Sequence, residues 1–309
     1  MNIDRIPDVR PDGTDNVTVK ICGNIIEVRY MPVTSVGCVI EKLSADLYVD
    51  RRTGEVKEFR HIANRAGDKA SVALSLRKLR DLINANLENP DSALWVTLTY
   101  AENMRDPARL YEDYRRFWGR FKYYLGKQNY PTAQYITAAE PQGRGALHLH
   151  CLFLFSEKAP FIPNADMARL WGHGFTKTKS LKGVDNPGLY LTAYLGDMEL
   201  SEIDKIGTAK GQLKAIEQID ENGHKTKKAI VKGARLYLYP PGFNIYRTSR
   251  NIKRPQIYQM TENEARELVG VAPLTYEKTV AVRDGAGKIQ NIVNYRTYTK
   301  GSTPRNGQD

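Results

Sequence analysis

The chain has 309 residues, 41% hydrophobic and 26% charged, which suffices to bury a core of ordinary size in one large domain, with or without appendages. No run approaches the ~18 apolar residues of a membrane span, and the N-terminus lacks an apolar signal core, so we expect no membrane association and a cytoplasmic location. Cys22, Cys38 and Cys151 are odd in number and widely spaced, which excludes a disulfide framework and a zinc pattern.

The charge is unevenly distributed. Of a net charge of +11, the segment from Lys205 to Asp309 contributes +10, from 19 Lys and Arg against 9 Asp and Glu. So localised an excess indicates a polyanionic partner, although a solvated basic tail would look similar.

Residues 1–90 predict a β-rich N-terminal extension followed by a helix. Val17–Arg29 alternates around Gly23-Asn24, and Asp46–Phe59 alternates around Arg52-Thr53-Gly54, as two hairpins would. Ser71–Leu87 has apolar residues at helical spacing. We find no chemistry in this part.

Residues 91–200 predict the core of the protein. An antiparallel sheet with helices on one face, the split βαβ or ferredoxin-like plan of the α+β class, fits the order strand, helix, strand, strand, helix, strand. The six predicted elements are Leu94–Tyr100, Arg109–Gly126, Tyr135–Ala139, Ala146–Phe155, Asp166–Leu170 and Phe175–Lys179.

Two histidines stand out within this core. His148 and His150 are two residues apart in the apolar strand Ala146–Phe155, so both point to the same face. Glu140 ends the preceding strand, and a short Gly-containing linker can turn the chain back beside it. These three residues could chelate a divalent cation such as Mg²⁺ or Mn²⁺. The alternative is a pair of satisfied or exposed histidines without a metal.

Two tyrosines follow. Tyr190 and Tyr194 are four residues apart in a predicted short helix, so both hydroxyls would lie on one side of it. A metal that polarises a phosphate, beside a tyrosine that attacks it, can cut a nucleic-acid strand and hold its end covalently.

Residues 201–309 form a basic extension that we expect to contact DNA. It begins with a predicted polar helix, Ser201–Ile219, and between Lys205 and Arg254 it holds 12 Lys and Arg against 3 Asp and Glu. Aromatic residues lie among these charges, as in a nucleic-acid track where bases stack and cations bind phosphates. A solvated charged face over buried tyrosines is the alternative. The aromatic residues are Tyr237, Tyr239, Phe243 and Tyr246, and the candidate DNA-binding cations are Arg144, Arg247, Arg250, Lys253 and Arg254.

Together these motifs resemble those of the His-hydrophobic-His (HUH) rolling-circle replication initiators of phages, plasmids and Gram-positive mobile elements. Trp95–Tyr100 is similar to the first family motif, His148-Leu149-His150 with Glu140 to the metal motif, and Tyr190–Tyr194 to the two-tyrosine motif. The chain departs from the family where a lysine commonly follows a nucleophilic tyrosine by three residues, because Ala193 and Asp197 occupy those positions.

The resemblance implies metal-dependent, site-specific nicking of single-stranded DNA at a replication origin. Tyr194 or Tyr190 would form a 5′-phosphotyrosine link, and the other would support strand transfer and religation. A host helicase and a polymerase would be partners, since the sequence has no phosphate-binding loop of the ATPase type. The alternatives are a non-catalytic DNA-binding regulator, and a relaxase or transposase of the same group.

Overall fold

The computed structural model describes residues 2–34, 38–182, 186–193, 195–199, 212–219 and 225–301. The chain divides into two compact units, one of Ala63–Arg254 and one that combines Met1–Ile62 with Pro255–Asp309. Within the described part of the chain, no helix is both long and apolar enough to cross a membrane.

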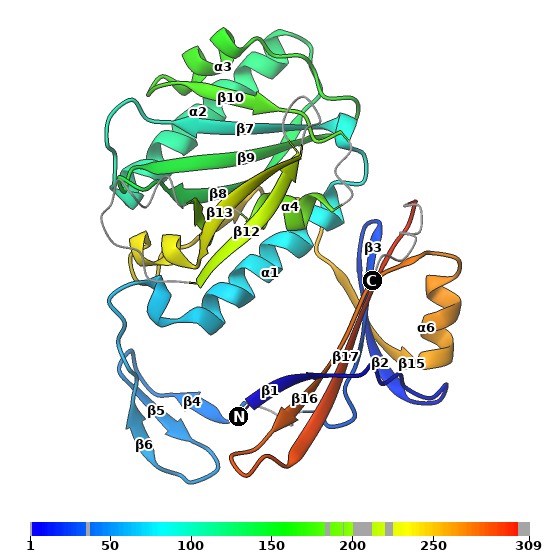
Figure 1. Ribbon diagram of the computed structural model, residues 1–309. Helices are drawn as coiled ribbons and strands as arrows, with labels where there is room; N and C mark the ends of the chain where they lie inside the picture. The colour runs from blue at the N-terminus through cyan, green and yellow to red at the C-terminus, as the bar shows by residue number, and fades with distance from the viewer. Residues whose placement is uncertain are drawn as a thin grey trace. The chain divides into compact units, whose positions relative to one another are not determined.

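The unit Ala63–Arg254 is built on a five-stranded antiparallel sheet (Figure 1). The strand order is β10 (Thr176–Lys179), β7 (Ala93–Thr99), β9 (Leu147–Phe155), β8 (Ala133–Pro141) and β14 (Tyr246–Thr248). Helix α2 (Pro107–Lys127) connects β7 to β8, and α3 (Asn164–Trp171) connects β9 to β10. Because β9 pairs antiparallel with both neighbours, β7 and β8 run parallel with β9 between them. This arrangement confirms the predicted antiparallel α+β plan.

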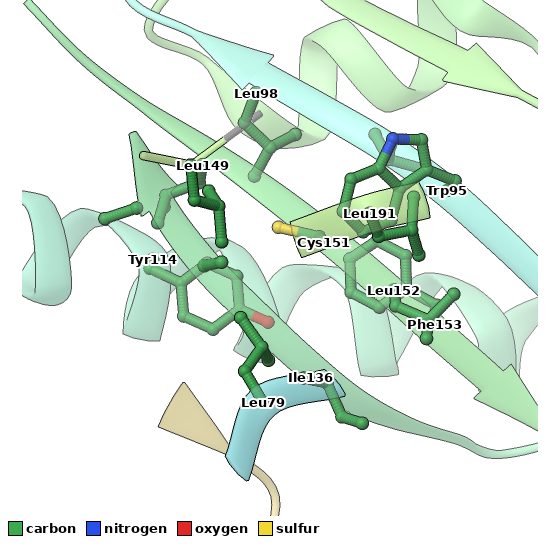
Figure 2. Packing of buried hydrophobic residues seen from close by; sticks show 14 of the residues in the cluster. Leu79, Trp95, Leu98, Tyr114, Ile136, Leu149, Cys151, Leu152, Phe153 and Leu191 are labelled. Carbon is green, nitrogen blue, oxygen red and sulfur yellow. The ribbon is translucent and has the colours of Figure 1, made fainter. Parts of the chain in front are cut away.

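Helices cover both faces of this sheet, whereas the sequence predicted them on one. Phe117 and Phe121 of α2 pack on Phe153 of β9, with ring centroids 6.1 and 4.7 Å apart. In the view of Figure 1, α2 passes behind the sheet while α1 (Lys69–Asn86) and α4 (Pro187–Ala193) lie in front of it. Figure 2 shows Leu79 of α1 and Leu191 of α4 within the same buried cluster.

Helices α1 and α4 approach each other closely at Gly188. Its backbone N–H donates to Asn84 Oδ1 at 2.9 Å. A Cβ atom at this position would lie 2.4 Å from the carbonyl oxygen of Arg80, so only glycine allows the contact. This packing holds the predicted tyrosine helix against α1.

A three-stranded sheet replaces part of the predicted polar helix Ser201–Ile219. Gln212–Ile219 forms β12, which pairs antiparallel with β13 (Lys225–Lys232), and β13 also pairs with β11 (Met198–Glu199). The helix prediction is therefore wrong for 212–219, because pairing with a partner strand overrides a weak local helix preference. Residues 201–211 lie outside the described part of the chain.

Three 3₁₀ helices complete the described part of this unit. They are η1 (Arg65–Gly67), η2 (Pro90–Ser92) and η3 (Ala234–Leu238). Helix η3 is the one that matters for the site, because it brings a distant basic residue to the end of β8.

The other unit contains a six-stranded antiparallel sheet from both ends of the chain. Its strand order is β1 (Asn2–Ile6), β16 (Leu274–Arg283), β17 (Ile289–Thr299), β3 (Ile25–Tyr30), β2 (Asn16–Cys22) and β15 (Gln256–Thr261). Helix α6 (Glu262–Val269) packs on one face through Ala265 and Val269. A small sheet of β4 (Ile40–Lys42), β5 (Leu47–Asp50) and β6 (Val56–Glu58) belongs to the same unit. The structure thus joins segments that the sequence analysis assigned to separate N- and C-terminal extensions.

Candidate active site

The predicted metal ligands lie on one face of the central strands. In the ladder between β8 and β9, His148 is directly opposite Glu140, and His150 is opposite Ala138. Glu140, His148 and His150 therefore share a face, as directly paired residues and residues two apart on a strand do. The turn between the strands is tight, with a hydrogen bond from Gln142 N–H to the carbonyl oxygen of Ala146 at 2.8 Å.

His150 is held in a fixed orientation. Its ring stacks on Trp95 of β7, with centroids 5.4 Å apart and planes inclined by 4°. Its Nδ1 lies 3.2 Å from the hydroxyl of Thr97, and its Nε2 is hydrogen-bonded to Glu140 Oε2. Packing and hydrogen bonding thus direct Nε2 of His150 toward the carboxylate.

His148 has a buried nitrogen with no partner. Among the described residues, nothing hydrogen-bonds its Nε2, and the same holds for the buried hydroxyl of Thr99, which lies directly opposite on β7. Burial lowers the pKa of His148 to about 4, so the imidazole is neutral at pH 7. An unpaired buried polar atom costs roughly 1–3 kcal/mol, and two of them on one strand pair indicate a place where something else binds.

Glu140 is held by a second residue, Arg235. Nη2 of Arg235 lies 2.9 Å from Glu140 Oε1, and the arginine is 4% exposed. Burial by itself would raise the pKa of Glu140, but the proximity and hydrogen bond of His150 and the charge of Arg235 lower it overall. The carboxylate is therefore ionised at neutral pH.

Arg235 and Tyr239 connect Glu140 to the segment that follows the tyrosine pair. Arg235 donates to the carbonyl oxygen of Pro141 at 2.7 Å and to that of Asp197 at 2.9 Å. The buried hydroxyl of Tyr239 lies 2.8 Å from the carbonyl oxygen of Ala139 and 3.1 Å from that of Leu195. The end of β8 is thus joined by hydrogen bonds to the backbone immediately after residue 194.

The sequence analysis missed Arg235 and assigned Tyr239 a different role. One arginine in a basic segment carries no spacing signal, so no pattern could have identified it. Tyr239 and Phe243 were predicted to stack on bases, but both are buried in the core, and that prediction is wrong for these two residues. The alternative of a charged face over buried aromatic residues describes this part of the segment better.

The two predicted nucleophiles are placed unequally. Tyr190 is on α4 and is 39% exposed, so it is accessible from solvent. Tyr194 lies outside the described residues. Helix α4 confirms the predicted short helix from Pro187 to Ala193.

The predicted DNA-binding cations are exposed but do not share one face. Arg144 lies in the turn that leads into β9, where its charge contributes to the lowered pKa of His148. Arg247 is opposite Thr137 in the sheet, so it faces away from His148, and its guanidinium lies 3.4 Å from the ring centroid of Tyr111 on α2. The other three exposed cations follow β14 and are Arg250, Lys253 and Arg254.

The chemistry of the three ligands suits a hard divalent cation. A neutral imidazole and an ionised carboxylate are the forms that bind Mg²⁺ or Mn²⁺, and the unpaired Nε2 of His148 is available to do so. In the described part of the chain, however, no group of three His, Cys, Asp or Glu side chains is arranged to hold a metal. Glu140 and His150 are bonded to each other, so binding requires that hydrogen bond to be replaced.

The fold and site define an α+β protein with a histidine–carboxylate cluster on the central strands of a split βαβ sheet. Residues 93–199, about a third of the chain, match the family model of replication-associated proteins of the ORF2 and gene-2-protein type. The matched segment contains Glu140, both histidines and both tyrosines. This match supports a protein that acts in the initiation of replication, with DNA as its partner. No curated protein and no solved structure gives a significant match.

Proposed function

We propose that this protein initiates rolling-circle replication by nicking single-stranded DNA at an origin, as HUH-type enzymes do. The observation that carries the proposal is the hydrogen-bonded connection from Glu140 through Arg235 and Tyr239 to the backbone of Leu195 and Asp197. A candidate metal ligand and the residues next to a candidate nucleophile are thereby held together, although they are more than fifty positions apart in the sequence.

Glu140, His148 and His150 are the residues that would hold Mg²⁺ or Mn²⁺. A bound cation would neutralise charge that develops on the phosphate during attack. Arg235 keeps the carboxylate ionised and oriented, and Trp95 keeps the ring of His150 in place. Arg235 also supplies a buried positive charge close to the site, in a chain that lacks the lysine common after the tyrosines in the family.

The reaction exchanges one phosphodiester bond for another. The tyrosine oxygen forms a bond to phosphorus as its hydroxyl proton leaves, and the bond from phosphorus to the 3′ oxygen breaks. The products are a 5′-phosphotyrosine and a 3′-hydroxyl, which takes up a proton and primes synthesis by a host polymerase. Because the bond energy is conserved, the second tyrosine can later support strand transfer and religation without a nucleotide cofactor. A host helicase would supply the unwinding.

The test is incubation with single-stranded origin-region DNA and Mn²⁺, followed by denaturing electrophoresis. We expect a covalent protein–DNA adduct that Tyr194→Phe abolishes or reduces by orders of magnitude, while Tyr190→Phe mainly impairs the second transfer. Tyr237→Phe, at an exposed tyrosine outside the motif, is the matched control. Peptide mapping that finds DNA on Tyr190 reverses the order, and DNA on neither tyrosine refutes the mechanism.

The metal ligands are tested separately. His148→Ala and His150→Ala should eliminate the adduct but keep most of the DNA affinity, because basic residues elsewhere supply it. Glu140→Gln should weaken the dependence on Mn²⁺ concentration. Cleavage at the wild-type rate by either histidine variant would show that the metal assignment is wrong.

A non-catalytic DNA-binding regulator is the second candidate. The observation that favours it is the direct bond between Glu140 and His150, together with the lack of a metal-type cluster in the described part of the chain. Such a protein would bind origin DNA equally with and without Mn²⁺ and would form no adduct. An adduct on transfer-origin or transposon-end DNA alone would instead indicate a relaxase or a transposase.

A further inference from the structure

The six-stranded sheet has two chemically different faces. Helix α6 packs on the face that carries Val17, Val19 and Val28, and Arg296 of β17 points to the same side, where it binds Glu262 of α6. Side chains alternate along a strand, so the neighbours of Arg296 on β17 point to the opposite side. We name that side the open face, and define it by Tyr276, Lys278, Tyr295, Thr297, Arg29 and Glu27.

Two exposed tyrosines are neighbours on the open face. Tyr276 on β16 is opposite Thr297, which is two residues from Tyr295 on β17. The two tyrosines are therefore diagonal cross-strand neighbours, about 7–8 Å apart at the backbone. Their exposed fractions are 52% and 40%, so both rings offer surface to solvent. Exposed aromatic rings on a sheet can stack on unpaired bases.

Cations flank one of these tyrosines on both sides. Lys278 and Arg29 are the residues directly opposite Tyr295 on the two adjacent strands. Neither forms an ion pair within the part of the chain that the structure describes. The acidic residue of the open face, Glu27, lies 2.5 Å from Lys20 and is neutralised by it. The row Lys278, Tyr295 and Arg29 is consequently positive and complementary to phosphate.

We propose that the open face binds single-stranded nucleic acid, with bases on Tyr276 and Tyr295 and phosphates on Lys278 and Arg29. A duplex keeps its bases stacked on each other and could contact only the cations, so the pair of exposed rings selects a single strand. The surface lies outside residues 93–199 and outside the predicted basic segment, and the proposal goes beyond the nicking reaction. It gives the unit formed by the two chain ends a role in holding DNA.

Binding of a fluorescently labelled oligothymidylate to the full chain tests the proposal. EDTA is present, so the outcome does not depend on cleavage or on the proposed metal site. The double change Tyr276→Ala with Tyr295→Ala should weaken binding about tenfold or more, and duplex binding should be unchanged. Tyr258→Ala is the matched control, because Tyr258 is an exposed tyrosine that pairs with Val19 and so lies on the α6 side.

The cations are tested by salt dependence. Arg29→Ala with Lys278→Ala should flatten the slope of log affinity against log salt by about 0.7 for each phosphate that is no longer bound. Lys288→Ala, at an exposed lysine in the turn between β16 and β17, should leave the slope nearly unchanged. Wild-type binding by the double tyrosine variant would overturn the proposal. So would equal losses on single strand and duplex, or an equal loss with Tyr258→Ala.

Discussion

Arg235→Met should destabilise the unit Ala63–Arg254 more than any exposed arginine change in it. The residue is 4% exposed, and its replacement removes an ion pair of 2.9 Å to Glu140 as well as donors to two carbonyl oxygens. Removing one partner of a buried pair leaves an uncompensated charge and costs roughly 3–5 kcal/mol. At a urea dependence of about 1–3 kcal/mol per molar, the unfolding midpoint should fall by on the order of 1–2 M.

Tryptophan fluorescence reads out this unit selectively. The chain has three tryptophans, and Trp95, Trp118 and Trp171 all lie within Ala63–Arg254. Urea unfolding followed by their emission therefore measures the unit that contains Arg235. Arg254→Met, at an exposed arginine of the same unit, is the matched control and should change stability by no more than about 0.5 kcal/mol.

The effect should also depend on pH in a defined direction. The pKa of Glu140 is lowered below its ordinary value of 4.5, so the ionised carboxylate stabilises the fold above that pH, and this contribution is lost as the pH falls through the folded-state pKa. The difference between wild type and Arg235→Met should therefore shrink in acid. A midpoint equal to that of Arg254→Met, or a difference that grows as the pH falls, would refute the reasoning.

Three further outcomes follow from the structure. Burial raises the pKa of the Cys151 thiol to about 12, so a thiol reagent should label exposed Cys38 in the native protein and leave Cys151 unlabelled even at about pH 9, as mass spectrometry would report. Glu262→Gln should accelerate hydrogen exchange in β17, because Glu262 is fully buried and accepts two hydrogen bonds of 2.6 Å from Arg296; faster exchange in β7 instead would contradict this. Removing cations from the basic segment should flatten the salt dependence of DNA binding by about 0.7–0.9 for each phosphate released, and an unchanged slope would place the track elsewhere. The positions to change together to alanine are Arg247, Arg250, Lys253 and Arg254.

The sequence alone determined the elements that local spacing encodes. The apolar run around His148 predicted β9, and the aromatic spacing between Leu110 and Leu125 predicted α2. The shared face of His148 and His150 follows from strand geometry, and the short linker after Glu140 brings that residue opposite His148. Each of these inferences depends on residues only a few positions apart, where periodicity carries the information.

Only the tertiary structure decided which distant segments meet. Arg235 reaches Pro141 over 94 positions, and Tyr239 reaches Ala139 over 100, without any pattern that could announce the contact. Gln212–Ile219 became a strand because β13 was available to pair with it, and β1 found its partner β16 at the other end of the chain. A backbone hydrogen bond or an ion pair depends on position in space and not on the sequence between the partners, so these contacts leave no periodic trace in the chain.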